Sequence, residues 1–181
     1  MKEHSTLVRY ELLGLLVKSC PYKPIPPFLI GIFRQYCVKA FQHPELPLQM
    51  FRDEHVRDFI FQAIATQQFP EEIEEEAVFH SAMLNFLYLL PRIDKVRTCT
   101  AHVCQQPLFQ CIVQENATKV VLPESKKKLD DYIRQIGLLT ATRLKGIQEG
   151  VVPESGSGPA TAQQELQMLQ LTLDLVGDSF R

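Results

Sequence analysis

Apolar residues recur along this chain at helical spacing, and the densest stretch is residues 71–91, EEIEEEAVFHSAMLNFLYLLP. Its first turns are rich in glutamate, which the positive end of a helix dipole stabilises. From Ala77 onward, apolar side chains cover most of the circumference, as in helices that are buried among other helices. We therefore predict a buried central helix that ends at Pro91, where a backbone donor is lost.

A membrane span is the alternative interpretation of this stretch. Spanning a bilayer as a helix takes about 20 consecutive apolar residues. The apolar run from Ala77 to Leu90 is shorter and contains His80 and Asn85. We therefore expect a core helix and no membrane partner.

Prolines divide the rest of the chain into segments of helical length. Ser5 is a candidate N-cap for the first helix, and Gly177 is a candidate stop for the last. The predicted helices cover residues 5–18, 27–42, 48 or 53 to 68, 92–105, 108–114 (or one kinked helix with the segment before it), 124–149 and 162–176. Residues 116–122 are predicted to form a loop. This pattern predicts an all-α fold of antiparallel helix pairs, stacked as a short α-solenoid or an irregular helical bundle.

The chain is expected to divide at residues 150–160, GVVPESGSGPA, which are rich in Gly, Ser and Pro and have no helical period. Such a composition is typical of a flexible linker. We expect a helical-repeat-like domain over residues 1–149, the linker over 150–160, and a C-terminal helix and tail over 161–181.

Residues 5–149, with their helices joined by short proline-containing turns, resemble the armadillo/HEAT type of α-solenoid. The resemblance implies a stack of helix pairs that binds other proteins. Such stacks need terminal helices with a polar outer face, whereas residues 5–18 are apolar over more than half of their surface. We expect that face to be covered by a partner or by the remainder of a longer chain.

Composition narrows the functional class only a little. The 181 residues carry a formal net charge of −2, so no global field favours nucleic acid or an anionic membrane. The five cysteines are scattered on apolar faces, and the N-terminus does not resemble a secretory signal. We expect reduced thiols in an intracellular protein, cytoplasmic or nuclear.

Two leucine sets are candidate partner-binding residues. Leu12, Leu15 and Leu16 satisfy an LxxLL pattern, which amphipathic helices use to bind grooves. Because the first helix is apolar all round, burial in the core is the favoured interpretation of this pattern. In the last helix, the residues that share one face and could dock on the body or on another protein are Leu166, Leu169 and Leu173.

One cluster has the residue types of a metal site: Cys99, His102, Cys104 and Cys111. Zinc binds four such ligands in a tetrahedral array. The spacing matches no common zinc finger, and free cysteine ordinarily packs as a small apolar residue. Core packing is favoured, and we expect no cofactor.

A nucleic-acid-associated helical repeat is the second hypothesis. It rests on basic residues in or beside the predicted helix over residues 124–149. These are Lys119, Lys126, Lys127, Lys128, Arg134, Arg143 and Lys145. It requires that these residues share one exposed face and that binding weakens steeply with salt.

No nucleophile elbow or phosphate-binding loop occurs in the sequence. We therefore expect a non-enzymatic protein-interaction scaffold.

Overall fold

The computed structural model describes residues 2–52, 54–65, 73–100, 123–149 and 159–179. Within these ranges every regular element is a helix and there is no strand, which confirms the all-α prediction. The elements, in chain order, are α1 (Lys2–Ser19), α2 (Ile25–Gln42), η1 (Gln49–Phe51), α3 (Glu54–Ala65), η2 (Ile73–Glu76), α4 (Ala77–Thr100), α6 (Pro123–Gln148) and α7 (Pro159–Ser179).

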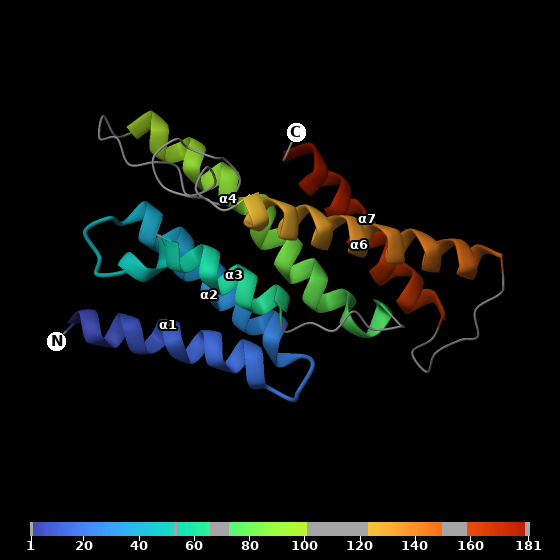
Figure 1. Ribbon diagram of the computed structural model, residues 1–181, viewed down its shortest axis with the longest axis horizontal. Coiled ribbons are helices and arrows are strands. Elements are labelled where there is room, and N and C mark those ends of the chain that lie inside the picture. Colours follow the sequence, from blue (N-terminus) through green and yellow to red (C-terminus); the bar gives the residue numbers. More distant parts are fainter. Residues whose placement is uncertain (1, 53, 66–72, 101–122, 150–158, 180–181) are drawn as a thin grey trace.

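The helices follow one another through space roughly as they do along the chain (Figure 1). α1 lies at one edge of the molecule and packs on α2 and α3. α4 contacts α2 on one side and α7 on the other, and α6 covers α7. α1 and the pair formed by α6 and α7 therefore lie on opposite sides of the central helix α4.

Proline and a local hydrogen-bond network fix the ends of α2. Pro26 and Pro27 occupy its first turn, where a missing backbone N–H leaves no helical bond unmade. At the other end the chain leaves helical geometry at His43. Arg52 then closes the turn by donating from Nη1 to the Pro44 carbonyl at 2.9 Å and from Nη2 to Gln49 Oε1 at 2.8 Å.

The predicted end of the central helix at Pro91 is wrong. α4 continues through Pro91 to Thr100, so no separate helix begins at residue 92. A proline inside a helix removes one hydrogen bond without always ending the helix. The start also differs, because the acidic run forms the 3-10 helix η2 over Ile73–Glu76 and the α-helix begins at Ala77.

Other boundaries shift by a few residues. α1 starts at Lys2, so Ser5 lies inside the helix and does not cap it. The third helix takes the later of its two predicted starts, because residues 49–51 form η1 and α3 begins at Glu54. α7 extends beyond its predicted range of 162–176 at both ends. The predicted helix 108–114 and loop 116–122, and most of the predicted linker, lie outside the described residues.

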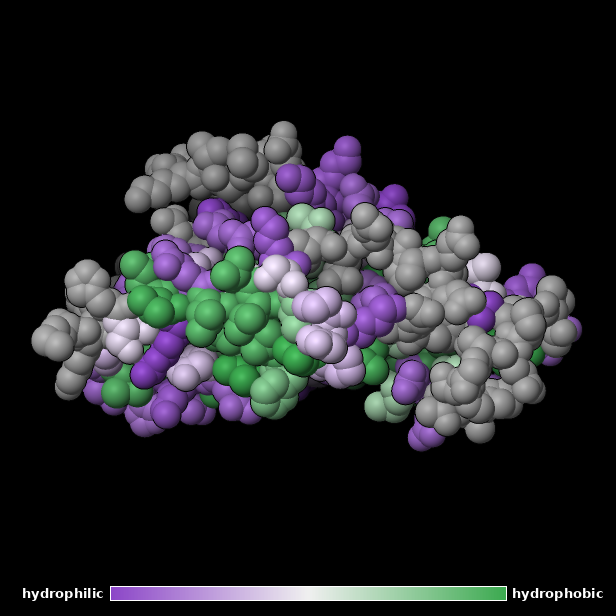
Figure 2. All heavy atoms as spheres, turned by 90° about the horizontal axis from the view of Figure 1, so that it is seen from below, coloured by the Kyte–Doolittle hydropathy of each residue, from purple (hydrophilic) through white to green (hydrophobic). Residues whose placement is uncertain are grey.

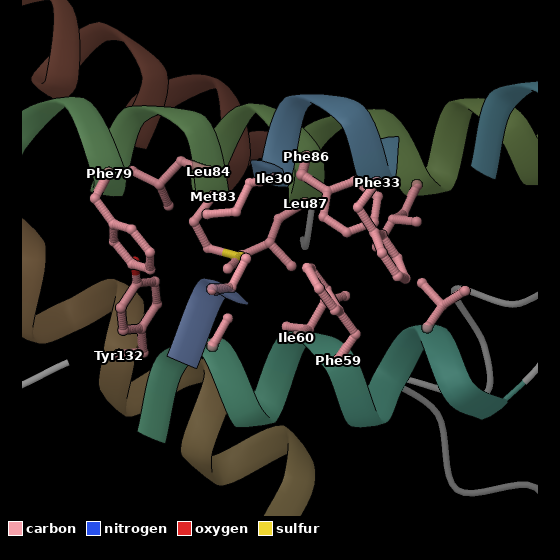
Figure 3. Close-up of a cluster of buried hydrophobic side chains, with 14 of the residues drawn as sticks. Ile30, Phe33, Phe59, Ile60, Phe79, Met83, Leu84, Phe86, Leu87 and Tyr132 are labelled. Atoms are coloured by element: carbon pink, nitrogen blue, oxygen red, sulfur yellow. The ribbon is translucent and has the colours of Figure 1, made fainter. Parts of the chain in front are cut away.

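Aromatic side chains from five elements form the centre of the core, and Figure 3 shows three of them, Phe33, Phe59 and Phe86. Phe33 of α2 stacks on Phe59 of α3 with ring centroids 3.6 Å apart and planes 6° apart. Phe51 of η1 and Phe86 of α4 approach the same Phe33 ring, at 5.1 Å and 5.8 Å. Tyr10 of α1 completes the group at 6.1 Å from Phe33. One ring of α2 therefore joins all four neighbours.

The burial predicted for the central helix is confirmed. Between Ala77 and Leu90, most apolar side chains are buried. Val78 is exposed, and Ala82, Tyr88 and Leu89 are half-buried. The fully covered members, at or near zero exposure, are Phe79, Met83, Leu84, Phe86, Leu87 and Leu90. Among the described residues no helix combines the length and apolar character needed to cross a membrane.

Candidate functional site

Polar contacts hold α1 in one rotational setting on the body. The Thr6 hydroxyl donates to the Pro47 carbonyl at 2.6 Å, and the Tyr10 hydroxyl donates to the His55 carbonyl at 3.0 Å. Leu13 and Val17 follow these residues on the same face and are buried. This setting determines which side of α1 faces away from the protein.

The opposite side of α1 is an exposed apolar surface, which we call the α1 outer face and define as Val8, Leu12, Leu15 and Leu16. These side chains are 60%, 52%, 60% and 37% exposed. Figure 2 looks at the molecule from the side of α1 and shows a continuous apolar area over this helix. Well-separated single leucines are ordinary on a protein surface, whereas a continuous patch indicates an interaction site.

The core interpretation of the LxxLL residues is therefore wrong. Leu12, Leu15 and Leu16 all lie on the α1 outer face, and only the intervening Leu13 is buried. The sequence pattern did not identify the buried side of α1, because that side includes Thr6 and Tyr10. Their hydroxyl groups donate hydrogen bonds to backbone carbonyls. A helix with two apolar sides gives no periodic signal for which side is covered.

The candidate partner-binding residues of the last helix are not available to a partner. Leu166, Leu169 and Leu173 are buried where α7 packs on α4 and α6. Sequence reasoning missed the other side of the same helix, on which Met168, Leu171 and Leu175 are exposed. Their spacing of three and four residues places them on one helical face. We call these three residues the α7 outer face.

Apolar exposure also occurs at the turn between α1 and α2. Tyr22, Ile25 and Phe28 are exposed there. Val78 and Leu138 are exposed on α4 and α6. Neither of these two helices shows a second large apolar residue that is exposed three or four positions away among those described, so neither forms a stripe of large apolar side chains.

A histidine–tyrosine pair joins α4 to α6 inside the protein. His80 Nδ1 lies 2.9 Å from the Tyr132 hydroxyl oxygen, and both side chains are buried. Burial lowers the pKa of His80 to about 4 and raises the pKa of the Tyr132 hydroxyl. Both groups are therefore neutral at neutral pH. Because both residues are almost completely buried, the pair is a structural contact between helices.

Cys37 is not a candidate nucleophile. Its side chain is fully buried in α2, and burial raises the pKa of the thiol. Reactive cysteines require a stabilised thiolate in a partly exposed site. Cys37 therefore serves as a small apolar core residue.

The basic residues of α6 do not converge on one face. Lys127, Arg134 and Lys145 do share a side, since they are separated by seven and eleven residues. Asp131 lies 3.8 Å from Arg134, and Glu149 lies 3.7 Å from Lys145. Lys128 and Arg143 belong to other sides of the helix. Lys119 and the Lys126 side chain lie outside what the structure describes.

The candidate zinc residues stay untested. His102, Cys104 and Cys111 lie outside the described residues, as does the side chain of Cys99. In the described part of the chain, no three His, Cys, Asp or Glu side chains are grouped as metal ligands.

An open hollow between α2 and α4 is lined by Arg34, Gln35, Val38, Lys39, Gln42 and Leu89.

Comparison with known proteins returned no matching family model, no matching curated protein and no matching solved structure.

Proposed function

We propose that this protein is a helical interaction scaffold whose α1 outer face binds another protein chain. The observation that carries the proposal is the exposure of Val8, Leu12, Leu15 and Leu16 on a helix whose setting is fixed by hydrogen bonds. An apolar stripe on a loosely held helix would turn inward. Here Thr6 and Tyr10 hold α1 with the stripe outward.

The size of the surface fits an interaction of moderate strength. Complete burial of a leucine or valine side chain is worth about 1.5–3 kcal/mol. Four side chains that are roughly half-exposed would therefore contribute on the order of 4 kcal/mol when covered. Association itself costs about that much or more. The α1 outer face is thus an anchor to which neighbouring residues must add affinity.

The armadillo/HEAT-like arrangement is part of the same proposal. Its support is the order of packing, in which α1 packs on α2 and α3, α2 packs on α4, α4 packs on α7, and α7 packs on α6 (Figure 1). In such stacks a helix that faces solvent at an end has a polar outer face. α1 and α7 instead carry apolar outer faces, which suits the docking of further helices at either side.

A non-enzymatic role is proposed because the buried titratable groups have structural positions. His80 and Tyr132 bind each other between two helices, and the Cys37 thiol is held protonated by burial. Within the described residues, none of the three reaches an open cavity. The reactive groups of these side chains therefore have no path to a substrate.

The test is quantitative affinity capture of the full chain from cells. The double variant Leu12→Gln/Leu15→Gln removes the centre of the α1 outer face, and Leu138→Gln is a matched control because Leu138 is the one large apolar side chain that is exposed in the described part of α6. We expect a set of proteins captured by the wild type and by Leu138→Gln to be lost from the double variant. Equal capture by all three chains would contradict the proposal. Circular dichroism must show equal helicity.

A further inference from the structure

The residues that flank the α1 outer face restrict what it can bind. We propose that its partner is a second copy of this chain, with the two α1 helices packed antiparallel about a two-fold axis. The inference rests on the proposed function, since it requires the α1 outer face to be an interface. It goes further by naming the occupant and the direction of its helix.

The α1 outer face has the spacing of a two-helix seam. Val8, Leu12 and Leu15 are separated by four and three residues, which is the alternation of heptad core positions. Ser5 and Ser19 continue the same spacing at the two ends. Small serines there would allow two helices to approach closely. The seam is therefore about two heptads long and suits a helix of similar length.

Opposite charges lie along one edge of this seam. Glu11 and Lys18 are exposed, and their separation of seven residues places them on the same side, about 10.5 Å apart along the helix. In the described part of the chain, neither side chain is in an ion pair, while five other pairs are present. Both charges are thus available to a partner.

This arrangement is self-complementary only when the helices run in opposite directions. In an antiparallel pair related by a two-fold axis, the same edge of each helix faces its counterpart. With the axis passing near Leu15, Glu11 of each copy lies opposite Lys18 of the other, and two ion pairs form. In a parallel pair the edge that carries Glu11 and Lys18 instead faces the edge that carries Arg9 and Leu16, where no acidic residue is available to Lys18.

The apolar contacts agree with this register. Leu15 lies nearest the axis, where it packs against its counterpart, with Leu12 and Leu16 beside it. α1 is the outermost helix on its side of the molecule, so the two bodies lie on opposite sides of the paired helices (Figure 1). In this register Leu12, Leu15 and Leu16 are covered by the partner's α1, whereas Val8 lies opposite position 21, beyond the end of that helix.

The test is sedimentation velocity of the full chain at low salt over a series of concentrations. We expect a monomer–dimer equilibrium. Glu11→Lys alone places lysine opposite lysine twice, and Lys18→Glu alone places glutamate opposite glutamate twice. Because exposed pairs are individually weak, each single change should weaken the dimer about tenfold. Lys39→Glu, on an exposed site of α2, is the control and should leave the dimer unchanged.

Two further mixtures make the test decisive. The double variant Glu11→Lys/Lys18→Glu should dimerise as the wild type does. A mixture of the two single variants should form mixed dimers more tightly than either variant pairs with itself. A chain that stays monomeric at all concentrations overturns the inference, as does a dimer that none of the charge changes affects. Either result leaves the α1-dependent capture of other proteins as a separate measurement, so the proposed function can stand or fall by itself.

Discussion

α4 and α1 are both apolar around much of their circumference, yet the protein uses them in opposite ways. α4 lies between α2 and α7, and its side chains from Ala77 to Leu90 are largely out of contact with water. α1 packs on α2 and α3 with one side and presents four apolar side chains on the other. An excess of apolar surface beyond what neighbouring helices cover therefore distinguishes an interface helix from a core helix.

The largest expected effect lies in the core. Phe86 of α4 is fully buried and its ring approaches Phe33 at 5.8 Å. Phe86→Ala removes these contacts and leaves a cavity, so the free energy of unfolding should fall by about 3–5 kcal/mol. Urea unfolding followed by circular dichroism measures this. The milder Phe86→Leu should lose less, and an unchanged unfolding midpoint in both variants would contradict the assignment of α4 as the central helix.

A smaller effect should follow from acid. The pKa of His80 is lowered by burial to about 4, whereas an unfolded histidine titrates near 6.5. The unfolded state therefore binds the proton first, so the stability that the neutral imidazole contributes is complete above about pH 6.5 and is lost as the pH falls towards 4. Between about pH 7.5 and pH 5 the loss should be about 2 kcal/mol.

The control for this titration is His80→Gln, which keeps a hydrogen-bonding group near Tyr132 but cannot titrate. Urea unfolding at several pH values, wild type beside variant, isolates the histidine from all other groups. The difference between the two chains should narrow as the pH falls. A difference that is constant with pH would contradict a buried neutral His80.

The smallest effect on stability should come from the α1 outer face. Leu12→Gln and Leu15→Gln exchange exposed leucines for polar residues, and substitutions at such sites usually change stability by less than about 0.5 kcal/mol. Urea unfolding of the chain at a concentration where it is monomeric checks this. A loss as large as that of Phe86→Ala would show that the two leucines are covered within the folded chain.

The sequence predicted the helices well because their signals are local. Apolar residues at intervals of three and four, and prolines at 26, 27 and 70, mark segments without any knowledge of their neighbours. The same local reasoning placed the end of α4 at Pro91, where a helix can pass through a proline when its surroundings favour continuation. Burial of the central helix was predictable since nearly every side of it is apolar.

The candidate site was harder to predict because exposure depends on which elements meet. In α1 the side with Thr6 and Tyr10 is the buried one, since Pro47 and His55 offer carbonyls to their hydroxyls. Those partners are more than forty residues away in sequence. In α7 the chosen leucines are the ones that meet α4 and α6, while Met168 and Leu171 remain outside. A helix with two apolar sides does not show which of them faces the core.

Site-specific photocrosslinking in cells tests most directly whether the α1 outer face is an interface. A photoreactive benzoylphenylalanine is placed by Leu12→benzoylphenylalanine in one chain and by Leu138→benzoylphenylalanine in another, since both positions are exposed. We predict covalent adducts to a second protein chain from position 12, well above those from position 138. Adducts from position 12 that do not exceed those from position 138 would contradict the account.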